Sequence, residues 1–204
     1  MKRFATAWGA ALALALAAPA VAAAPAGAQV GSVAPTFTAP ASLAGHTFTF
    51  SLAKALAKGP VVVYFYPAAY TQGCDIEAHT FSTHHAAFAK AGATIIGVSQ
   101  DSIATLNKFS SDPDYCAGKF PVASDPQGKV GARYGVGMTP AQQGVTNVKG
   151  LPVTHGFFAR TTFVLDKGGK VVARFSSAKD HISPAQHVTR SLAIVQKMQA
   201  QAAR

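Results

Sequence analysis

The stretch that most constrains the fold is an apolar run that leads directly into a helix start. Residues 61–66 read Val-Val-Val-Tyr-Phe-Tyr, a β-branched and aromatic pattern that is typical of a buried central strand. The run ends at Pro67, and after Cys74 the apolar residues recur at spacings of three and four, which predicts an amphipathic helix. Strand, turn and helix in this order place Cys74 in the first turn of a helix, at the carboxyl end of a central strand. In open α/β sheets, ligands bind at that end.

The position of Cys74 favours chemistry at its sulfur. Backbone N–H groups at a helix start lack intrahelical partners, and the macrodipole is positive there, so a thiolate is favoured over a thiol. Thr71, three residues earlier, offers a hydroxyl that can donate and accept hydrogen bonds beside the sulfur. The sequence therefore predicts an activated cysteine.

The rest of the chain predicts an α/β fold in a single domain. Residues 94–99 form a second apolar strand, and two such strands joined by a helix make a right-handed parallel βαβ unit. A Gly/Pro-bearing segment over 137–158 has little periodicity, and a loop of this length is usually functional or partly mobile. The remaining expected elements are strands at 37–38 and 46–50, a helix at 51–58, a helix from 101–102, a strand at 120–125, a helix at 126–134, a hairpin of 160–166 with 170–175, and a final helix from Ser183-Pro184.

The amino terminus has the layout of a secretory signal. Lys2 and Arg3 precede an apolar stretch over residues 4–18, which small residues follow. The alternative, a retained membrane anchor, is disfavoured because the stretch is short for a bilayer and Pro19 interrupts it. We expect a signal peptide over residues 1–28, a domain over residues 29–204 and export to the periplasm or beyond. The A-x-A pattern at 26–28 is the expected cleavage site, with 20–22 and 22–24 as competitors.

The charge pattern argues against a nucleic-acid partner. The chain has a formal net charge of +10, which could attract anions. Its basic residues are scattered, without runs or interleaved aromatic residues, so we interpret the charge as general surface character. No second long apolar stretch follows the signal, so we expect no membrane contact once it is removed.

The seven histidines do not predict a metal site. Three lie on the helix after Cys74, but not at the spacing of three or four that puts two ligands on one helical face. The others are scattered, and we expect solvated histidines rather than metal ligands. Six of the seven are considered for this role: His79, His84, His85, His155, His181 and His187.

Cys74 and Cys116 are the only cysteines of the chain. In an oxidising compartment, two cysteines often form a structural disulfide. The environment of Cys74 favours a redox role instead.

Four segments of the chain resemble the peroxiredoxins of the alkyl hydroperoxide reductase/thiol-specific antioxidant type, and among them the bacterioferritin-comigratory, or Q-type, branch. The resemblance covers nearly all of the expected mature chain, and its core pattern is Pro-x-x-x-Thr-x-x-Cys. It implies a thioredoxin-like fold, with a central mixed β-sheet flanked by helices, and reduction of hydrogen peroxide or organic hydroperoxides without a cofactor. The four segments are 30–37, 65–77, 120–125 and 160–166.

The resemblance assigns a role to each site residue. Cys74 would be the peroxidatic nucleophile, and Arg160 would lower its pKa and polarise the peroxide. Thr71 would bind the peroxide and the sulfur, Pro67 would shield the sulfur, and the amides near Gly73 and Cys74 would hold the peroxide oxygens. Each residue also has an ordinary interpretation: a surface ion pair for Arg160, a helix N-cap for Thr71 and a strand terminator for Pro67.

The resemblance also implies that Cys116 is the resolving cysteine of an intramolecular cycle. Family members that place this cysteine on the next helix match Cys116, whereas the variant with a cysteine five residues after Cys74 is excluded by His79. The implied reductant is a thioredoxin-like or other dithiol protein, and we expect a monomer or weak homodimer. Gln72 and Asp75 depart from the usual pattern, and Asp75 should oppose thiolate formation slightly.

Three rival functions remain at this point. A thiol–disulfide oxidoreductase would need a second nearby cysteine, as in Cys-x-x-Cys, and a copper-handling module would need paired cysteines with a histidine. A non-catalytic exported domain with a structural Cys74–Cys116 disulfide needs only the two cysteines present.

Overall fold

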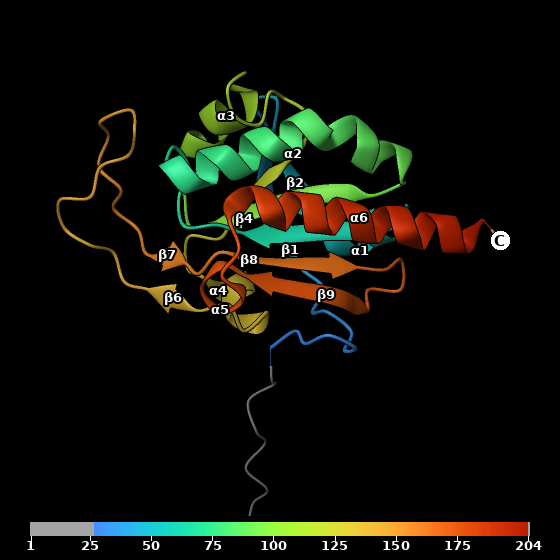
Figure 1. Ribbon diagram of the computed structural model, residues 1–204. Helices are drawn as coiled ribbons and strands as arrows, with labels where there is room; N and C mark the ends of the chain where they lie inside the picture. Colours follow the sequence, from blue (N-terminus) through green and yellow to red (C-terminus); the bar gives the residue numbers. More distant parts are fainter. Residues whose placement is uncertain (1–26, 204) are drawn as a thin grey trace, which may run out of the picture.

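A seven-stranded mixed sheet lies at the centre of residues 27–203, the part of the chain that the computed structural model describes (Figure 1). The three inner strands β3, β4 and β5 run parallel, and their outer neighbours β1 and β8 run antiparallel to them. This confirms the predicted α/β fold with a central mixed sheet. In sheet order the strands are β2 (His46–Ser51), β1 (Thr38–Leu43), β5 (Val122–Ser124), β4 (Thr94–Ser99), β3 (Val61–Phe65), β8 (Thr161–Leu165) and β9 (Val171–Ser176).

Helices cover both faces of the sheet. α2 and α6 pack side by side on one face, and α3 joins them there (Figure 1). α1 and α4 contribute to the core on the other face. The helices are α1 (Leu52–Leu56), α2 (Gln72–Lys90), α3 (Ile103–Ser111), α4 (Lys129–Arg133), α5 (Ser177–Asp180) and α6 (Pro184–Ala202).

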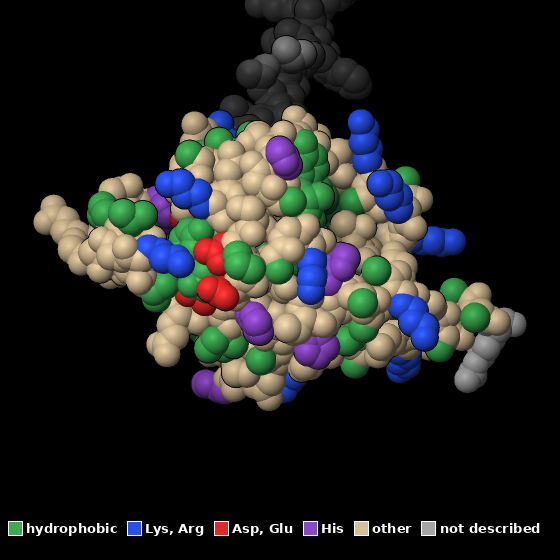
Figure 2. All heavy atoms as spheres, turned by 90° about the horizontal axis from the view of Figure 1, so that it is seen from above, with side chains coloured by type: hydrophobic (Ala, Val, Ile, Leu, Met, Phe, Trp, Pro, Cys, Tyr) green, Lys and Arg blue, Asp and Glu red, His purple; other side chains and the backbone are tan. Residues whose placement is uncertain are grey.

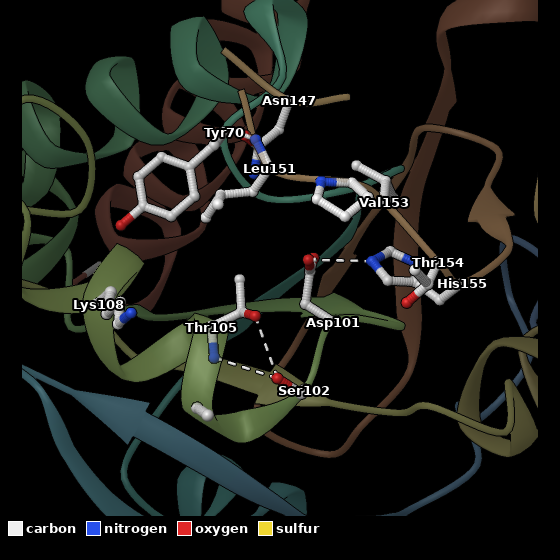
Figure 3. A pocket seen from close by; sticks show the side chains of 12 residues that line it. Tyr70, Asp101, Ser102, Thr105, Lys108, Asn147, Leu151, Val153, Thr154 and His155 are labelled. Atoms are coloured by element: carbon white, nitrogen blue, oxygen red, sulfur yellow. Dashed lines mark hydrogen bonds and ion pairs between the residues drawn. The ribbon is translucent and has the colours of Figure 1, made fainter. Parts of the chain in front are cut away.

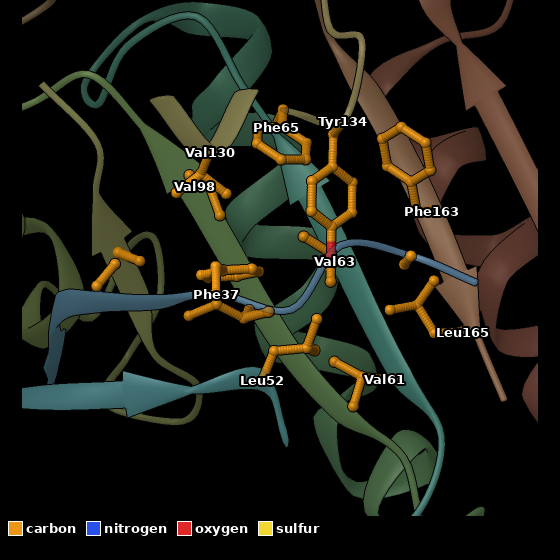
Figure 4. Packing of buried hydrophobic residues seen from close by; sticks show 14 of the residues in the cluster. Phe37, Leu52, Val61, Val63, Phe65, Val98, Val130, Tyr134, Phe163 and Leu165 are labelled. Carbon is orange, nitrogen blue, oxygen red and sulfur yellow. The ribbon is translucent and has the colours of Figure 1, made fainter. Parts of the chain in front are cut away.

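Strand β3 is buried on both faces because its side chains alternate between two hydrophobic clusters. Val61, Val63 and Phe65 point into one cluster, where Phe65 packs against Tyr134 (Figure 4). Val62 and Tyr64 point into the other cluster, beneath α2, α3 and α6. Burying each such side chain stabilises the fold by roughly 1.5–3 kcal/mol. The clusters therefore fix β3, and with it the turn that follows.

The start of α6 is fixed by a capping box. The Ser183 hydroxyl accepts a hydrogen bond from the Gln186 amide at 3.3 Å, and the Gln186 side chain accepts one from the Ser183 amide at 2.8 Å. Pro184 occupies the first turn, as the sequence predicts. A Cβ atom added at Gly73 would lie 3.6 Å from Pro184, so this capped end lies against the start of α2.

Three local features differ from the sequence-based expectation. The segment 137–158 contains a small two-stranded sheet of β6 (Met138–Thr139) and β7 (Phe157–Phe158), from which the connecting loop protrudes (Figure 1). Helix α5 was not expected, because a single turn is too short to show periodicity. Cys116 lies in turns after the end of α3 rather than on a helix.

Of the expected signal peptide, residues 1–26 lie outside the described part. Gly27 and Ala28 lie inside it. Ala28 is 3% exposed in the core, and a Cβ atom at Gly27 would come within 2.4 Å of Gly135. These two residues therefore pack as part of the folded domain.

Candidate active site

Cys74 lies in the first turn of α2, the helix that follows β3, as predicted. Thr71 occupies the N-cap position, and its carbonyl oxygen accepts hydrogen bonds from the amides of Cys74 and Asp75 at 2.8 and 2.9 Å. The Cys74 side chain packs in the cluster beneath α2, and the residue is only 2% exposed. The sulfur is therefore held in a defined place but is shielded from water.

Arg160 contacts this sulfur. Its Nη2 atom donates a hydrogen bond to Cys74 Sγ at 3.2 Å, and its Nη1 atom donates to the carboxylate of Glu77. Strand β8 begins at Thr161, which pairs with Phe65 at the end of β3, so Arg160 comes beside the turn that follows β3. The predicted pairing of Arg160 with Cys74 is present, and Arg160 is not a surface ion-pairing residue.

Glu77 was given no role in the sequence analysis, yet it anchors the guanidinium. Its side chain is fully buried, one turn after Cys74 on α2, and burial raises its pKa to about 7 against the opposing charge of Arg160. The spacing of three residues from Cys74 puts both groups on one helical face, which is the signal that could have identified it.

The turn before the helix contains the other predicted residues. Thr71 is the N-cap residue of α2, as its ordinary interpretation has it, but its side chain makes no capping hydrogen bond: the hydroxyl donates to the Ala68 carbonyl oxygen at 2.8 Å. Pro67 is half-buried, two residues after the end of β3. A Cβ atom at Gly73 would lie 3.1 Å from Arg160 Nη2, so a glycine there lets the guanidinium approach closely.

Tyr70 holds a strained place in this turn. Its φ is +59°, which is uncommon for a bulky side chain, while its ring is buried against Phe109 and Tyr115. Its carbonyl oxygen accepts a hydrogen bond from the Val148 amide at 2.8 Å. The loop between β6 and β7 thus docks on the active-site turn.

The electrostatics of Cys74 differ from the sequence-based expectation. Burial raises the pKa of the Cys74 thiol above its ordinary value, while the Arg160 charge and hydrogen bonds with Thr71 and Ala68 lower it by less. Desolvation therefore opposes the predicted thiolate in this closed arrangement, and the Arg160 charge favours it.

Asp75 also affects Cys116. Burial raises the pKa of Cys116, and the charges of Asp112 and Asp75 raise it further. Its own pKa is raised to about 6 by burial, with Lys149 opposing and Asp112 adding to the shift. The side chain therefore faces the Cys116 segment.

Cys116 is a fully buried free thiol, and Cys74 is free as well. Both belong to the cluster beneath α2 and α3. Burial raises the pKa of Cys116 well above its ordinary value. The structure therefore describes the reduced protein, without the structural disulfide that one interpretation of the sequence allowed.

Asp101 holds the turn between β3 and α2 through a hydrogen bond to its backbone. One carboxylate oxygen accepts hydrogen bonds from the Ala69 amide at 2.8 Å and the Ser99 hydroxyl at 2.7 Å. The other binds His155 at 3.0 Å, and both side chains line a cavity of about 230 Å³ (Figure 3). Burial lowers the pKa of His155, but its hydrogen bonds to Asp101 and the Gly156 carbonyl oxygen raise it by more.

Two histidines are not solvated as predicted. His155 is half-buried against Asp101, and His187 is fully buried, with hydrogen bonds to Thr162 at 2.8 Å and Ser177 at 2.9 Å. Burial and the nearby Arg160 charge lower the pKa of His187 to about 4. Both therefore serve packed polar networks.

Residues 27–203 contain no group of three or more His, Cys, Asp or Glu side chains that could hold a metal ion. No helix within that range is long and apolar enough to span a membrane. Lys and Arg side chains are spread over the face with α2, α3 and α6 rather than gathered (Figure 2).

The fold is that of the thioredoxin-like, thiol-dependent peroxidases. Residues 30–174 match the AhpC/TSA family. The chloroplastic peroxiredoxin Q of Oryza sativa subsp. japonica is 35% identical over 168 residues, which are 82% of this chain and 67% of that protein. The chain belongs to the AhpC/TSA family and is a thiol-dependent peroxidase, an oxidoreductase.

Solved structures agree with this assignment. Peroxidoxin BcpB from Mycobacterium tuberculosis superposes with a TM-score of 0.67 at 30% identity, over 83% of this chain and 97% of that one. The bacterioferritin comigratory protein of Xanthomonas campestris superposes with a TM-score of 0.60 at 29% identity, over 78% and 91% of the two chains. The predicted resemblance to the Q-type branch is thereby confirmed.

Proposed function

We propose that this protein reduces hydrogen peroxide and organic hydroperoxides with Cys74 as the peroxidatic nucleophile. The observation that carries the proposal is the 3.2 Å contact between Arg160 Nη2 and Cys74 Sγ at the start of α2. The Cys74 thiolate attacks one peroxide oxygen, an S–O bond forms and the O–O bond breaks. The sulfur is oxidised to a sulfenic acid, and the other oxygen leaves as water or an alcohol after taking up a proton.

The surrounding groups have complementary roles. Because burial raises the pKa of Cys74, the thiol must lose its proton before attack, and Arg160 stabilises the anion that results. The Thr71 hydroxyl and the amides of Gly73 and Cys74 are the hydrogen-bonding groups that a bound peroxide would meet. Pro67 borders the turn and limits the access of water to the sulfur.

Cys116 would complete the cycle. Its thiol sulfur attacks the Cys74 sulfenic acid, an S–S bond forms, and the hydroxyl leaves as water. Both sulfurs are buried in separate segments, so the start of α2 must unwind locally before they meet. A thioredoxin-like or other dithiol protein then returns the disulfide to two thiols. The protein acts as a monomer or weak homodimer in this scheme.

Mass spectrometry after one equivalent of peroxide tests this cycle. The wild-type protein should lose two hydrogen atoms on forming a disulfide, whereas Cys116→Ser should gain one or more oxygen atoms on Cys74. Cys74→Ser should consume no peroxide. Unchanged turnover in Cys74→Ser would defeat the proposed mechanism, and a disulfide-free cycle in the wild type would remove Cys116 from it.

We further propose that the protein is exported. The basic, apolar and small-residue pattern over residues 1–28 supports a cleaved signal. Cleavage after Ala28 would remove Gly27 and Ala28, which pack in the domain, whereas cleavage after Ala22 or Ala24 would keep them. N-terminal sequencing of protein recovered from a periplasmic extract tests this: an intact Met1 would overturn export by this route, and a start at 23 or 25 is expected.

A further inference from the structure

The loop between β6 and β7 brings a lysine to the region between the two cysteines. The tip of this loop is organised by Asn147, whose side-chain oxygen accepts hydrogen bonds from the amides of Lys149 and Leu151, each at 3.0 Å. The neighbouring Val148 amide binds the Tyr70 carbonyl oxygen. These contacts hold Lys149 over the active-site turn.

The Lys149 ammonium contacts both cysteine-bearing segments at once. Its Nζ atom lies 5.4 Å from the ring centroid of Tyr70, which precedes Cys74 by four residues. It also lies 5.4 Å from the ring centroid of Tyr115, the neighbour of Cys116. Finally, it lies 3.6 Å from Asp112 Oδ2, in the turn that leads to Cys116.

The carboxylates near the Lys149 ammonium also come from both cysteine-bearing segments. Asp75 comes from the first turn of α2 and Asp112 from the Cys116 turn, so each segment contributes one carboxylate. Asp75 Oδ1 is buried and has no hydrogen-bond partner within residues 27–203. Lys149 is the cation that offsets both carboxylates, and without it they repel each other across the two segments.

We propose that Lys149 is a positioning residue that clamps the Cys74 and Cys116 segments in their reduced arrangement and thereby sets the rate of disulfide formation between them. This inference rests on the proposed two-cysteine cycle. Lys149 takes part in no bond that forms or breaks. Because the sulfurs must leave their buried places to meet, every contact that joins the closed segments slows the step after sulfenic acid formation.

A rapid-quench experiment tests the clamp. Lys149→Met keeps the aliphatic stem and removes the charge, Lys149→Arg keeps the cation, and Lys58→Met is a matched control at an exposed lysine after α1. Each reduced protein is mixed with one equivalent of hydrogen peroxide, quenched with acid and analysed by mass spectrometry. Disulfide formation from the sulfenic acid should be roughly tenfold faster in Lys149→Met, since two cation–π contacts and one exposed ion pair are lost.

The pattern among the variants separates a positioning role from a merely structural one. The rate constant for the first oxidation of Cys74 should stay within about twofold in every variant, because Lys149 does not touch the sulfur in the structure. Lys149→Arg and Lys58→Met should form the disulfide at the wild-type rate. A disulfide rate in Lys149→Met that is unchanged or slower than wild type would overturn the clamp.

Hydrogen exchange separates the clamp from the proposed cycle. In the reduced protein, the amides of Asp75 and Ala117 are hydrogen-bonded within the two clamped segments, and the Val148 amide joins the loop to Tyr70. All three should exchange faster in Lys149→Met. Amides of β3 should not change. Unchanged exchange at all three would overturn the clamp whatever the disulfide does. If exchange is faster but no variant forms a disulfide, Lys149 does hold the two segments together. The two-cysteine cycle would then be wrong, and so would the proposed effect of Lys149 on the rate of disulfide formation.

Discussion

The guanidinium of Arg160 joins the Cys74 sulfur to the Glu77 carboxylate, with one terminal nitrogen on each. The planar fork of arginine makes this double contact possible, and a lysine ammonium would reach one partner at a time. Because Cys74 and Glu77 lie one turn apart on α2, the helix itself sets the spacing that the fork bridges. Orientation of the cation toward the sulfur is therefore built into the first two turns of α2.

Replacing Arg160 should slow the reaction with peroxide. We expect Arg160→Gln to lower the second-order rate constant by roughly 10²–10³, the effect of removing one donor that stabilises charge in a transition state. The pKa of Cys74, followed by the rate of alkylation against pH, should rise because the charge that opposes burial is lost. Arg190→Gln, at an exposed arginine on α6, is the control and should behave as wild type. Equal rates in the two variants would contradict the assignment.

Removing the Glu77 carboxylate should destabilise the fold. Glu77→Ala leaves the largely buried Arg160 cation without its partner, at a cost of about 3–5 kcal/mol. The melting temperature should fall by several degrees, which thermal unfolding monitored by circular dichroism will show. A double variant, Glu77→Ala with Arg160→Met, should recover part of this loss because no unpaired charge remains. Recovery of nothing would mean that packing, rather than the ion pair, explains the loss.

The Thr71 hydroxyl should matter more for reaction than for folding. Thr71→Val keeps the shape of the side chain but removes the hydroxyl that donates to the Ala68 carbonyl oxygen beside the sulfur. We expect a roughly tenfold slower reaction with peroxide, the effect of one lost hydrogen bond. Thr71→Ser should retain most of the activity. Competition against a second peroxidase of known rate measures the change, and equal rates for the valine and serine variants would be the contrary result.

Stability should fall at alkaline pH because both thiols titrate late in the folded state. Burial raises the pKa of Cys74 and Cys116, so the folded protein holds these protons more tightly than the unfolded chain does. The unfolded chain loses them from about pH 8.5 upward. Stability from this source is complete below that pH and declines as pH rises toward the folded pKa values.

Urea unfolding of the reduced protein between pH 7 and 9.5 measures this dependence. The free energy of unfolding should decline with pH in the wild type and decline less in Cys116→Ala, which has one late-titrating thiol fewer. The same pH dependence in both proteins would show that Cys116 does not contribute.

The sequence was sufficient to predict the helices and strands that have strong local patterns. The apolar run at 61–66, the capping residues before α6 and the hairpin of β8 with β9 predicted their structures because pattern, cap and turn agree locally. The approach of Arg160 to Cys74 was expected from a family resemblance alone. Periodicity has no information on which strand ends meet across a sheet.

The missed features depend on tertiary contacts. Glu77, Asp101 and His187 are polar residues that look solvent-exposed in sequence, and only packing shows that each is buried with partners. The raised pKa of Cys74 was missed for the same reason, because a helix start predicts a thiolate only where water or partners compensate the anion. Burial is a property of the whole fold.

The backbone of Tyr70 adds an energetic bias to the start of α2. A bulky residue held at a φ of +59° stores of order 1–3 kcal/mol that the ring packing and the Val148 hydrogen bond offset in the closed arrangement. Once those contacts release, the residue relaxes to an ordinary backbone angle and the stored energy favours the unwound segment. Backbone strain in the turn ahead of the reactive sulfur thus lowers the free energy that unwinding costs once Cys74 is oxidised.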